Sequence, residues 1–176
     1  MARKEKNCKA NINVEKLSRN KFNLQFLAIL KMNDYIMTIT NILGIKINII
    51  IENDKSDTHY TTNTVAYYKL QNGYNIYIRE KEDYSIFDMY IIAREIRIMW
   101  QFNKNFEYYF YGYRLNGMTD EQYESHISNI DADVFAYLII KNKFKKEIKR
   151  NYRYNSSELK FRKLLNSAES EGKYLK

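Results

Sequence analysis

The chain has 176 residues, of which 45% are hydrophobic, so it can bury a core and is predicted to form a single domain over residues 1–176. Its 29 lysines and arginines against 21 aspartates and glutamates give a net charge of +8, which favours an anionic partner. A single cysteine, Cys8, excludes an internal disulfide framework and a cysteine-rich zinc site.

The N-terminal quarter is predicted to hold a tail and two helices. Residues 1–9 (MARKEKNCK) lack the apolar core of a signal peptide and are predicted to form a flexible basic tail. Apolar residues recur at helical spacing within residues 14–32, and Asp34 is predicted to cap a second helix over residues 35–43. Gly44 then suits the position just after a helix end, where the backbone φ angle is often positive.

Three strands are predicted next. Residues 46–52 (KINIIIE) are rich in β-branched side chains, which favour a strand. Residues 65–71 and 74–80 are two further strand-like runs separated by Asn72-Gly73. Because Asn-Gly accommodates positive φ at both turn positions, it predicts a type I′ hairpin between them.

Residues 85–101 (SIFDMYIIAREIRIMWQ) predict the central helix of the domain. The segment has no proline or glycine and is apolar around most of its circumference, as in a helix buried in a core. Asp83 or Ser85 is predicted to cap its start. Arg94, Arg97 and Gln101 are spaced three to four residues apart and therefore share one side of the helix.

The C-terminal half predicts further helices. Thr119 or Asp120 starts one, and residues 127–148 continue an apolar helical segment. Asn155 or Ser156 caps the last, within a C-terminal helix and tail over residues 155–176. This order of elements predicts an α+β domain with a short antiparallel or mixed sheet that includes a hairpin.

The pentad Arg94-Glu95-Ile96-Arg97-Ile98, followed by Met99-Trp100-Gln101, resembles the HExxH helix of small zincin metallopeptidases of the ImmA/IrrE kind. In that motif two histidines one turn apart bind zinc, and the glutamate is the general base. Here Arg94 stands at the first ligand position and Ile98 at the second. Only Glu95 keeps its family identity.

Residues 130–136 (IDADVFA) are similar to the second conserved helix of that family, where an acidic residue supplies the third ligand. Asp131 falls at that place. The resemblance implies a small zincin-like domain whose two motif helices cross beneath the sheet, with former metal-ligand positions at Arg94, Ile98 and Asp131. Because both histidines are lost, it implies a catalytically inactive protein with a vestigial Glu95, no bound metal and no cofactor.

The role of Arg94 has two interpretations. A guanidinium beside Glu95 and Asp131 would replace the positive charge of the lost zinc and act as a structural staple. Alternatively, arginines on this helix pair on the surface with nearby acids, namely Glu95, Asp88 or Asp133.

A metal-dependent hydrolase, either a nuclease or a peptidase with a rebuilt site, is the alternative function. His126 and the distant His59 are the only histidines available to rebuild such a site, but their spacing matches no known metal motif. The C-terminal half also offers carboxylates as magnesium ligands for nuclease chemistry: Glu121, Glu124, Asp131 and Asp133.

A basic run over residues 141–163 carries the chain's excess of positive charge, interleaved with aromatic residues. Lysine and arginine neutralise phosphates, and aromatic rings stack on bases, so the run is a candidate nucleic-acid surface. The candidate partner-binding residues are Lys141, Lys143, Lys145, Lys146, Lys149, Arg150, Tyr152, Arg153 and Tyr154. The alternative is an ordinary solvated helix end. A tyrosine-rich run, residues 108–113, is a second candidate surface.

These features together predict a binding or inhibitory factor that acts on a nucleic acid or a nucleoprotein complex. Small basic single-domain proteins of phages and mobile elements, anti-CRISPR proteins among them, often work in this way. No run of uncharged apolar residues is long enough to span a bilayer, so no membrane partner is expected and the predicted location is the cytoplasm.

Overall fold

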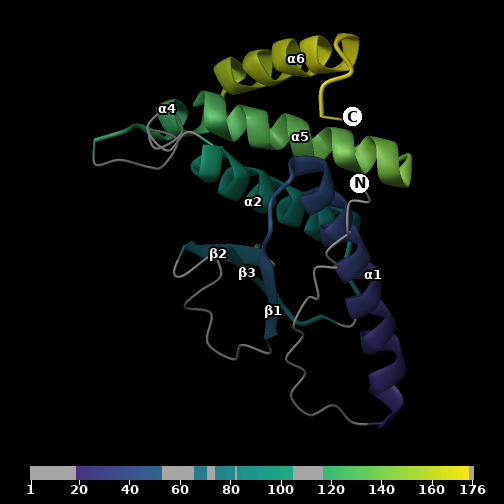
Figure 1. Cartoon of the computed structure of the whole chain (residues 1–176). Helices are drawn as coiled ribbons and strands as arrows, with labels where there is room; N and C mark the ends of the chain where they lie inside the picture. The colour runs from purple at the N-terminus through teal and green to yellow at the C-terminus, as the bar shows by residue number, and fades with distance from the viewer. Residues whose placement is uncertain (1–18, 53–65, 71–73, 82, 105–116, 175–176) are drawn as a thin grey trace, which may run out of the picture.

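Five helices and a three-stranded sheet make up the part of the chain that the computed structural model describes, which is residues 19–52, 66–70, 74–81, 83–104 and 117–174. The elements are α1 (Arg19–Leu43), β1 (Asn48–Glu52), β2 (Ala66–Leu70), β3 (Tyr74–Arg79), α2 (Ile86–Lys104), α4 (Asp120–Glu124), α5 (Ile127–Phe144) and α6 (Asn155–Ser170). The predicted α+β class is confirmed (Figure 1). None of the described helices is both long and apolar enough to cross a bilayer.

Helix α1 is continuous, so the predicted break at Asp34 is wrong. Asp34 is exposed, while Met32, Tyr35 and Ile39 are buried on the other side of the same helix. This buried stripe continues at helical spacing past Asp34, and burial of the stripe outweighs a local capping preference. Gly44 does end the helix, with φ at +63° and the paired backbone hydrogen bonds of a Schellman turn.

The sheet is mixed and has the strand order β1-β3-β2. Strand β1 pairs parallel with β3, and β2 pairs antiparallel with β3. The two strands predicted on either side of Asn72-Gly73 are therefore present and adjacent, but the turn itself lies outside the described residues. Ile49, Ile76 and Ile78 are buried in the core that the sheet shares with α1 and α2.

The elements are stacked in layers, with α2 between the sheet and α5, and with α6 on the far side of α5 (Figure 1). The two helices whose sequences were compared with the zincin motifs thus pack on each other, but only α2 lies next to the sheet. Helix α5 is buried at 12 of its 18 residues, because one side contacts α2 and the other contacts α6. This double burial explains why apolar residues occur on more than one side of the helix.

Residues 145–154, here called the strap, connect α5 to α6. Helix α5 ends at Phe144 rather than at the predicted Ile148, and Lys145 adopts the left-handed conformation with φ at +55°. The two helices run in the same direction, since Lys141 bonds to Glu169 at one end and Lys160 bonds to the Ser125 carbonyl at the other. Ten residues must therefore return along a helix about 27 Å long, which requires an almost extended strap.

Candidate functional site

Helix α2 begins with a reciprocal cap between Ser85 and Asp88. The backbone N–H of Asp88 donates to Ser85 Oγ at 3.1 Å, and the backbone N–H of Ser85 donates to Asp88 Oδ2 at 2.8 Å. This arrangement confirms the predicted cap at Ser85.

A polar seam runs between α2 and α5. On α2 its members are Tyr90, Arg94, Arg97 and Gln101, spaced so that all four lie on one side of the helix. On α5 its members are Ser128, Asn129, Asp131 and Asp133, all buried. The sequence correctly placed Arg94, Arg97 and Gln101 on a common side, and that side contacts α5.

One half of the seam is centred on Asp131. Arg97 donates to both carboxylate oxygens, at 2.8 Å and 3.2 Å, and Gln101 donates to Oδ2 at 2.7 Å. Tyr174, near the C-terminus, also bonds to this carboxylate. The Arg97 guanidinium lies 3.9 Å from the centre of the Trp100 ring. Burial alone would raise the pKa of Asp131, but hydrogen bonds from Arg97 and its charge outweigh burial and hold that pKa below its usual range.

The other half of the seam is centred on Arg94 and Asp133. Arg94 donates to Asp133 at 2.9 Å, to Glu95 at 3.1 Å and to Asn129 at 2.9 Å. The Tyr90 hydroxyl donates to the same Asp133 oxygen at 2.8 Å. Burial raises the pKa of Glu95 against the opposing charge of Arg94.

The staple predicted at Arg94 is therefore present in part. Arg94 does pair with Glu95, but its second carboxylate is Asp133, whereas Asp131 pairs with Arg97. The alternative interpretation named Asp133 correctly, although the Arg94–Asp133 pair lies between two helices and not on the surface. Each arginine of α2 consequently has its own buried aspartate on α5.

The three positions that the zincin resemblance predicts as former ligands are not arranged as ligands. Arg94 and Asp131 belong to different halves of the seam, and Ile98 is a half-buried apolar residue. Across the described ranges, no three side chains of His, Cys, Asp or Glu gather closely enough to hold a metal ion. His126 caps α5, because its side chain accepts from the Ser128 backbone N–H. His59 lies outside the described residues.

The four carboxylates considered as magnesium ligands serve separate structural contacts. Asp131 and Asp133 pair with the two arginines of α2. Glu121 accepts from the Ser156 hydroxyl, and Glu124 accepts from the backbone N–H groups of Arg153 and Tyr154. Together Glu121 and Glu124 join α4 to the start of α6.

The strap covers one end of the seam, an arrangement that the sequence did not predict. The Tyr152 hydroxyl donates to Asp133 Oδ2 at 3.2 Å, and Arg150 Nε lies 3.5 Å from the same oxygen. Beside them is a polar pocket of about 290 Å³ lined by Arg94, Asp120, Tyr123, Glu124, Asn129, Asp133, Arg150, Arg153 and Tyr154. Its three arginines are matched in number by three carboxylates, so the pocket has no strong preference for one sign of charge.

The strap divides the candidate partner-binding residues into two groups. From Glu147 to Tyr154, odd-numbered side chains are exposed and even-numbered ones are half-buried. Arg150, Tyr152 and Tyr154 therefore turn inward, and the Tyr152 ring packs on Phe161. The same period-2 alternation is visible in the sequence, where Ile148, Tyr152 and Tyr154 occupy even positions and Glu147, Lys149 and Asn151 occupy odd ones.

The remaining candidate partner-binding residues are basic, and only some of them form an ion pair or a hydrogen bond with another side chain. Lys141 forms an ion pair with Glu169 at 2.7 Å, and Arg153 forms one with Asp120 at 3.1 Å. Lys143 donates to the Thr38 hydroxyl at 2.9 Å. In contrast, no described carboxylate pairs with Lys145, Lys146 or Lys149, and all three are exposed. The tyrosine-rich run at residues 108–113 lies outside the described residues.

Comparison of the chain with protein-family models, with curated proteins and with solved structures gave no match. The seam and the strap are therefore interpreted from their own contacts. Those contacts show an arrangement that holds helices together and leaves Lys145, Lys146 and Lys149 exposed, with no carboxylate partner in the part of the chain that the structure describes.

Proposed function

We propose that this protein is a catalytically inactive, zincin-like binding or inhibitory factor that acts on a nucleic acid or a nucleoprotein complex. Two features support the inactive part of the proposal. Glu95, the one motif residue kept from the resembled family, is held by Arg94 at 3.1 Å. The carboxylate of Asp133 on α5, which also pairs with Arg94, is already contacted by four side chains: Tyr90, Arg94, Tyr152 and Arg150.

The observation that carries the binding part is the outer face of the strap. Lys145, Lys146 and Lys149 are exposed and face no carboxylate among the described residues, although acidic side chains pair with several of their neighbours. Lysines without internal partners are available for phosphates, and each phosphate that they neutralise releases condensed counterions. The proposed contact is therefore electrostatic and independent of nucleotide sequence.

Fluorescence anisotropy with labelled single- and double-stranded oligonucleotides tests this proposal. A triple variant, Lys145→Gln, Lys146→Gln and Lys149→Gln, should bind more weakly to every sequence. The plot of log K against log[salt] should flatten by about 0.7–0.9 per lost phosphate contact, which is about 2.1–2.7 if all three lysines are used.

The matched control is a second triple variant with the same loss of charge elsewhere: Lys31→Gln, Lys46→Gln and Lys104→Gln. These three lysines are also exposed, but they lie on or beside α1 and at the end of α2. If both triple variants flatten the salt dependence equally, only net charge matters and the strap is not the contact surface. If neither has an effect, the nucleic-acid proposal fails.

A nucleoprotein target would give a different pattern. Loss of charge at the rim of a protein interface mainly slows association and changes its salt dependence, with little effect on dissociation. Binding kinetics against the complex recovered from the native host, with the same two triple variants, separates this case from direct phosphate contact.

A further inference from the structure

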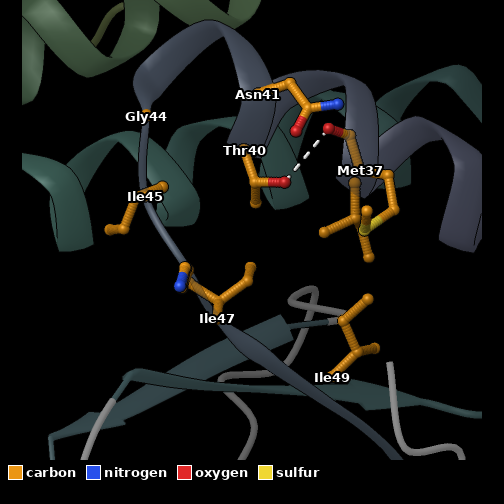
Figure 2. A pocket seen from close by; sticks show the side chains of 9 residues that line it. Met37, Thr40, Asn41, Gly44, Ile45, Ile47 and Ile49 are labelled. Carbon is orange, nitrogen blue, oxygen red and sulfur yellow. Dashed lines mark hydrogen bonds between the residues drawn. The ribbon is translucent and has the colours of Figure 1, made fainter. Parts of the chain in front are cut away.

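Two pockets of similar size offer different chemistry. The first lies between α1 and the start of β1 and is lined mostly by apolar side chains, Ile45, Ile47 and Ile49 among them (Figure 2). The hydroxyl of Thr40 in its wall already donates to the Met37 carbonyl at 3.0 Å. The second is the polar pocket of about 290 Å³ beside the strap. Because converging polar groups select and orient a ligand, the polar pocket is the stronger candidate for a binding site.

One donor in the wall of the polar pocket lacks an acceptor. Arg150 Nε is buried and has no hydrogen-bond partner in the described part of the chain. The oxygen with which it forms an ion pair, Asp133 Oδ2, lies 3.5 Å away, beyond the usual hydrogen-bond range of about 2.7–3.2 Å. The Arg150 side chain is still 31% exposed, so its guanidinium is accessible from the pocket. Since buried donors in folded proteins almost always have a partner, we expect an acceptor atom of a ligand at Arg150.

Glu124 of α4 adds an acceptor to the same pocket. It accepts from the backbone N–H groups of Arg153 at 3.2 Å and of Tyr154 at 3.3 Å, and both bonds end on Oε1. The other oxygen, Oε2, accepts no hydrogen bond from any residue that the structure describes. An inorganic anion would satisfy Arg150 but would bring like charge to Glu124. A ligand that suits both residues must carry an acceptor and a donor.

Aromatic rings complete the walls. Tyr123 of α4 and Tyr154 of the strap line the pocket, and the Arg153 guanidinium lies 5.6 Å from the centre of the Tyr154 ring. Unpaired nucleobases stack on such rings and on guanidinium planes, and they are recognised by hydrogen bonds along their edges. A nucleobase is also flat and uncharged, which suits a pocket whose three arginines are balanced by three carboxylates.

We propose that the polar pocket binds the base of one unpaired nucleotide in a single-stranded nucleic acid, with a preference for guanine. Guanine presents two acceptors, O6 and N7, to an arginine in the commonest base-specific contact, and Arg150 supplies that arginine here. The N1–H and amino groups of guanine are donors for Glu124 Oε2.

The inference rests on the proposed function, because the strand must also be held by its phosphates. Lys149 is exposed and directly precedes Arg150, which lines the pocket. Adjacent Cα atoms are about 3.8 Å apart, so a phosphate bound at Lys149 and a base bound at Arg150 can belong to one nucleotide or to two neighbouring ones. The lysines then supply affinity for any sequence, and the pocket adds a preference for one base.

A single guanine in a uniform strand tests this preference. Anisotropy is measured with labelled oligothymidylate strands that carry guanine, adenine or cytosine at one central position, and with the unsubstituted strand. Wild-type protein should bind the guanine strand about five-fold more tightly than the others, or better, since one paired arginine–guanine contact discriminates by at least that factor. Equal binding of all four strands would overturn the inference and leave the lysine contact intact. Absence of binding to every strand would overturn the proposed function and the inference with it.

Two substitutions test whether the preference arises in the pocket. Arg150→Lys keeps the charge but loses the paired donors, so the guanine strand should lose most of its advantage. Glu124→Gln keeps one oxygen for the backbone N–H groups and replaces the other with an amide donor, which should also reduce the advantage. The control is Glu158→Gln on α6, because Glu158 pairs with the exposed Arg162 and does not line the pocket. Its ratio of guanine-strand to thymine-strand affinity should equal that of wild-type protein.

Thermal melting by circular dichroism checks that each variant is folded at the temperature of the binding measurements. Either pocket variant decides the question if the other does not fold. A guanine preference that persists at full size in a folded pocket variant would place the base contact elsewhere and overturn the inference.

Discussion

Arg97 of α2 and Asp131 of α5 form a buried, two-bonded ion pair that joins the two central helices of the domain. Its hydrogen bonds measure 2.8 Å and 3.2 Å, and the two residues are 5% and 7% exposed. Gln101 and Tyr174 occupy the remaining positions around the carboxylate. A fully buried ion pair contributes little net stability, because the cost of removing both charges from water offsets their attraction. Removal of one partner is nevertheless costly, because it leaves the other charge buried without a partner.

Arg97→Ala is therefore expected to lower the free energy of unfolding by about 3–5 kcal/mol. Urea denaturation followed by fluorescence measures this directly, because Trp100 is the only tryptophan and lies 3.9 Å from the Arg97 guanidinium. Arg97→Lys should recover only part of the loss, since an ammonium cannot form both bonds at once.

Arg162→Ala is the control for that measurement. Arg162 pairs with Glu158 at 2.6 Å, but its side chain is 70% exposed, so its loss should cost less than about 1 kcal/mol. If Arg97→Ala and Arg162→Ala had similar effects, Arg97 would not be the connection between the helices that the geometry indicates.

Much of the fold was predictable because it depends on local patterns. The capped start of α2, the glycine that ends α1 and the strands flanking Asn72-Gly73 each follow from a few neighbouring residues. The spacing of Arg94, Arg97 and Gln101 also correctly placed them on one side of a helix.

The pairing of charges within the seam was not predictable in the same way. Helical spacing tells which residues share a side, but not which residue of a second helix each will meet. That depends on how α2 and α5 cross, and the crossing is set by the packing of their apolar side chains. The sequence therefore left both Asp131 and Asp133 open as partners of Arg94, whereas the structure pairs Asp133 with Arg94 and Asp131 with Arg97.

Acid should weaken the fold through Asp131. The pKa of Asp131 in the folded protein lies below its usual range, so the unfolded chain binds this proton more readily. The stabilisation is therefore present at pH values above about 4, the usual aspartate range, and is lost as the pH falls through the lowered folded value.

Urea midpoints measured from neutral to acidic pH should show this loss in wild-type protein and a smaller one in Asp131→Asn. Glu95→Gln should change the pH dependence of stability in the direction opposite to Asp131→Asn. The pKa of Glu95 is raised, so the contribution of this residue to the free energy of unfolding becomes less favourable as the pH rises through its titration range. An acid dependence that is unchanged in Asp131→Asn would contradict the assignment.

Zinc content tests the resemblance to zincins. Wild-type protein purified without added metal should contain far less than one zinc per chain, because neither Arg94 nor Ile98 can ligate the metal. Arg94→His together with Ile98→His should bind zinc and melt at a higher temperature when zinc is added, measured by elemental analysis and circular dichroism.

The third ligand in that double variant is expected to be Asp133, because it is the α5 carboxylate bonded to the side chain at position 94. Asp133→Asn added to the double variant should then abolish the zinc-dependent rise in melting temperature. A folded double variant that takes up no zinc would count against the resemblance itself.

Tyr152 distinguishes an internal role for the strap from a role in stacking on bases. Its hydroxyl donates to the buried Asp133, and its ring packs on Phe161 at 5.4 Å between ring centres. Tyr152→Phe keeps the ring and removes only the hydroxyl, so it should lower the free energy of unfolding by about 0.5–1.5 kcal/mol. Its affinity for oligonucleotides should be unchanged.

Tyr152→Ala removes the ring as well and should destabilise the protein more than Tyr152→Phe does, but by less than the roughly 3–5 kcal/mol of a fully buried aromatic residue, because Tyr152 is half-buried. If Tyr152 instead stacked on a base, Tyr152→Ala would weaken single-strand binding by about 1–3 kcal/mol under conditions where the variant is still folded. Anisotropy measurements well below the melting temperature, with Lys149→Gln as a binding-defective control of normal stability, separate these outcomes. We expect the stability of Tyr152→Ala to fall and its binding to hold, because the Tyr152 side chain makes internal contacts, whereas the proposed phosphate contacts come from exposed lysines such as Lys149.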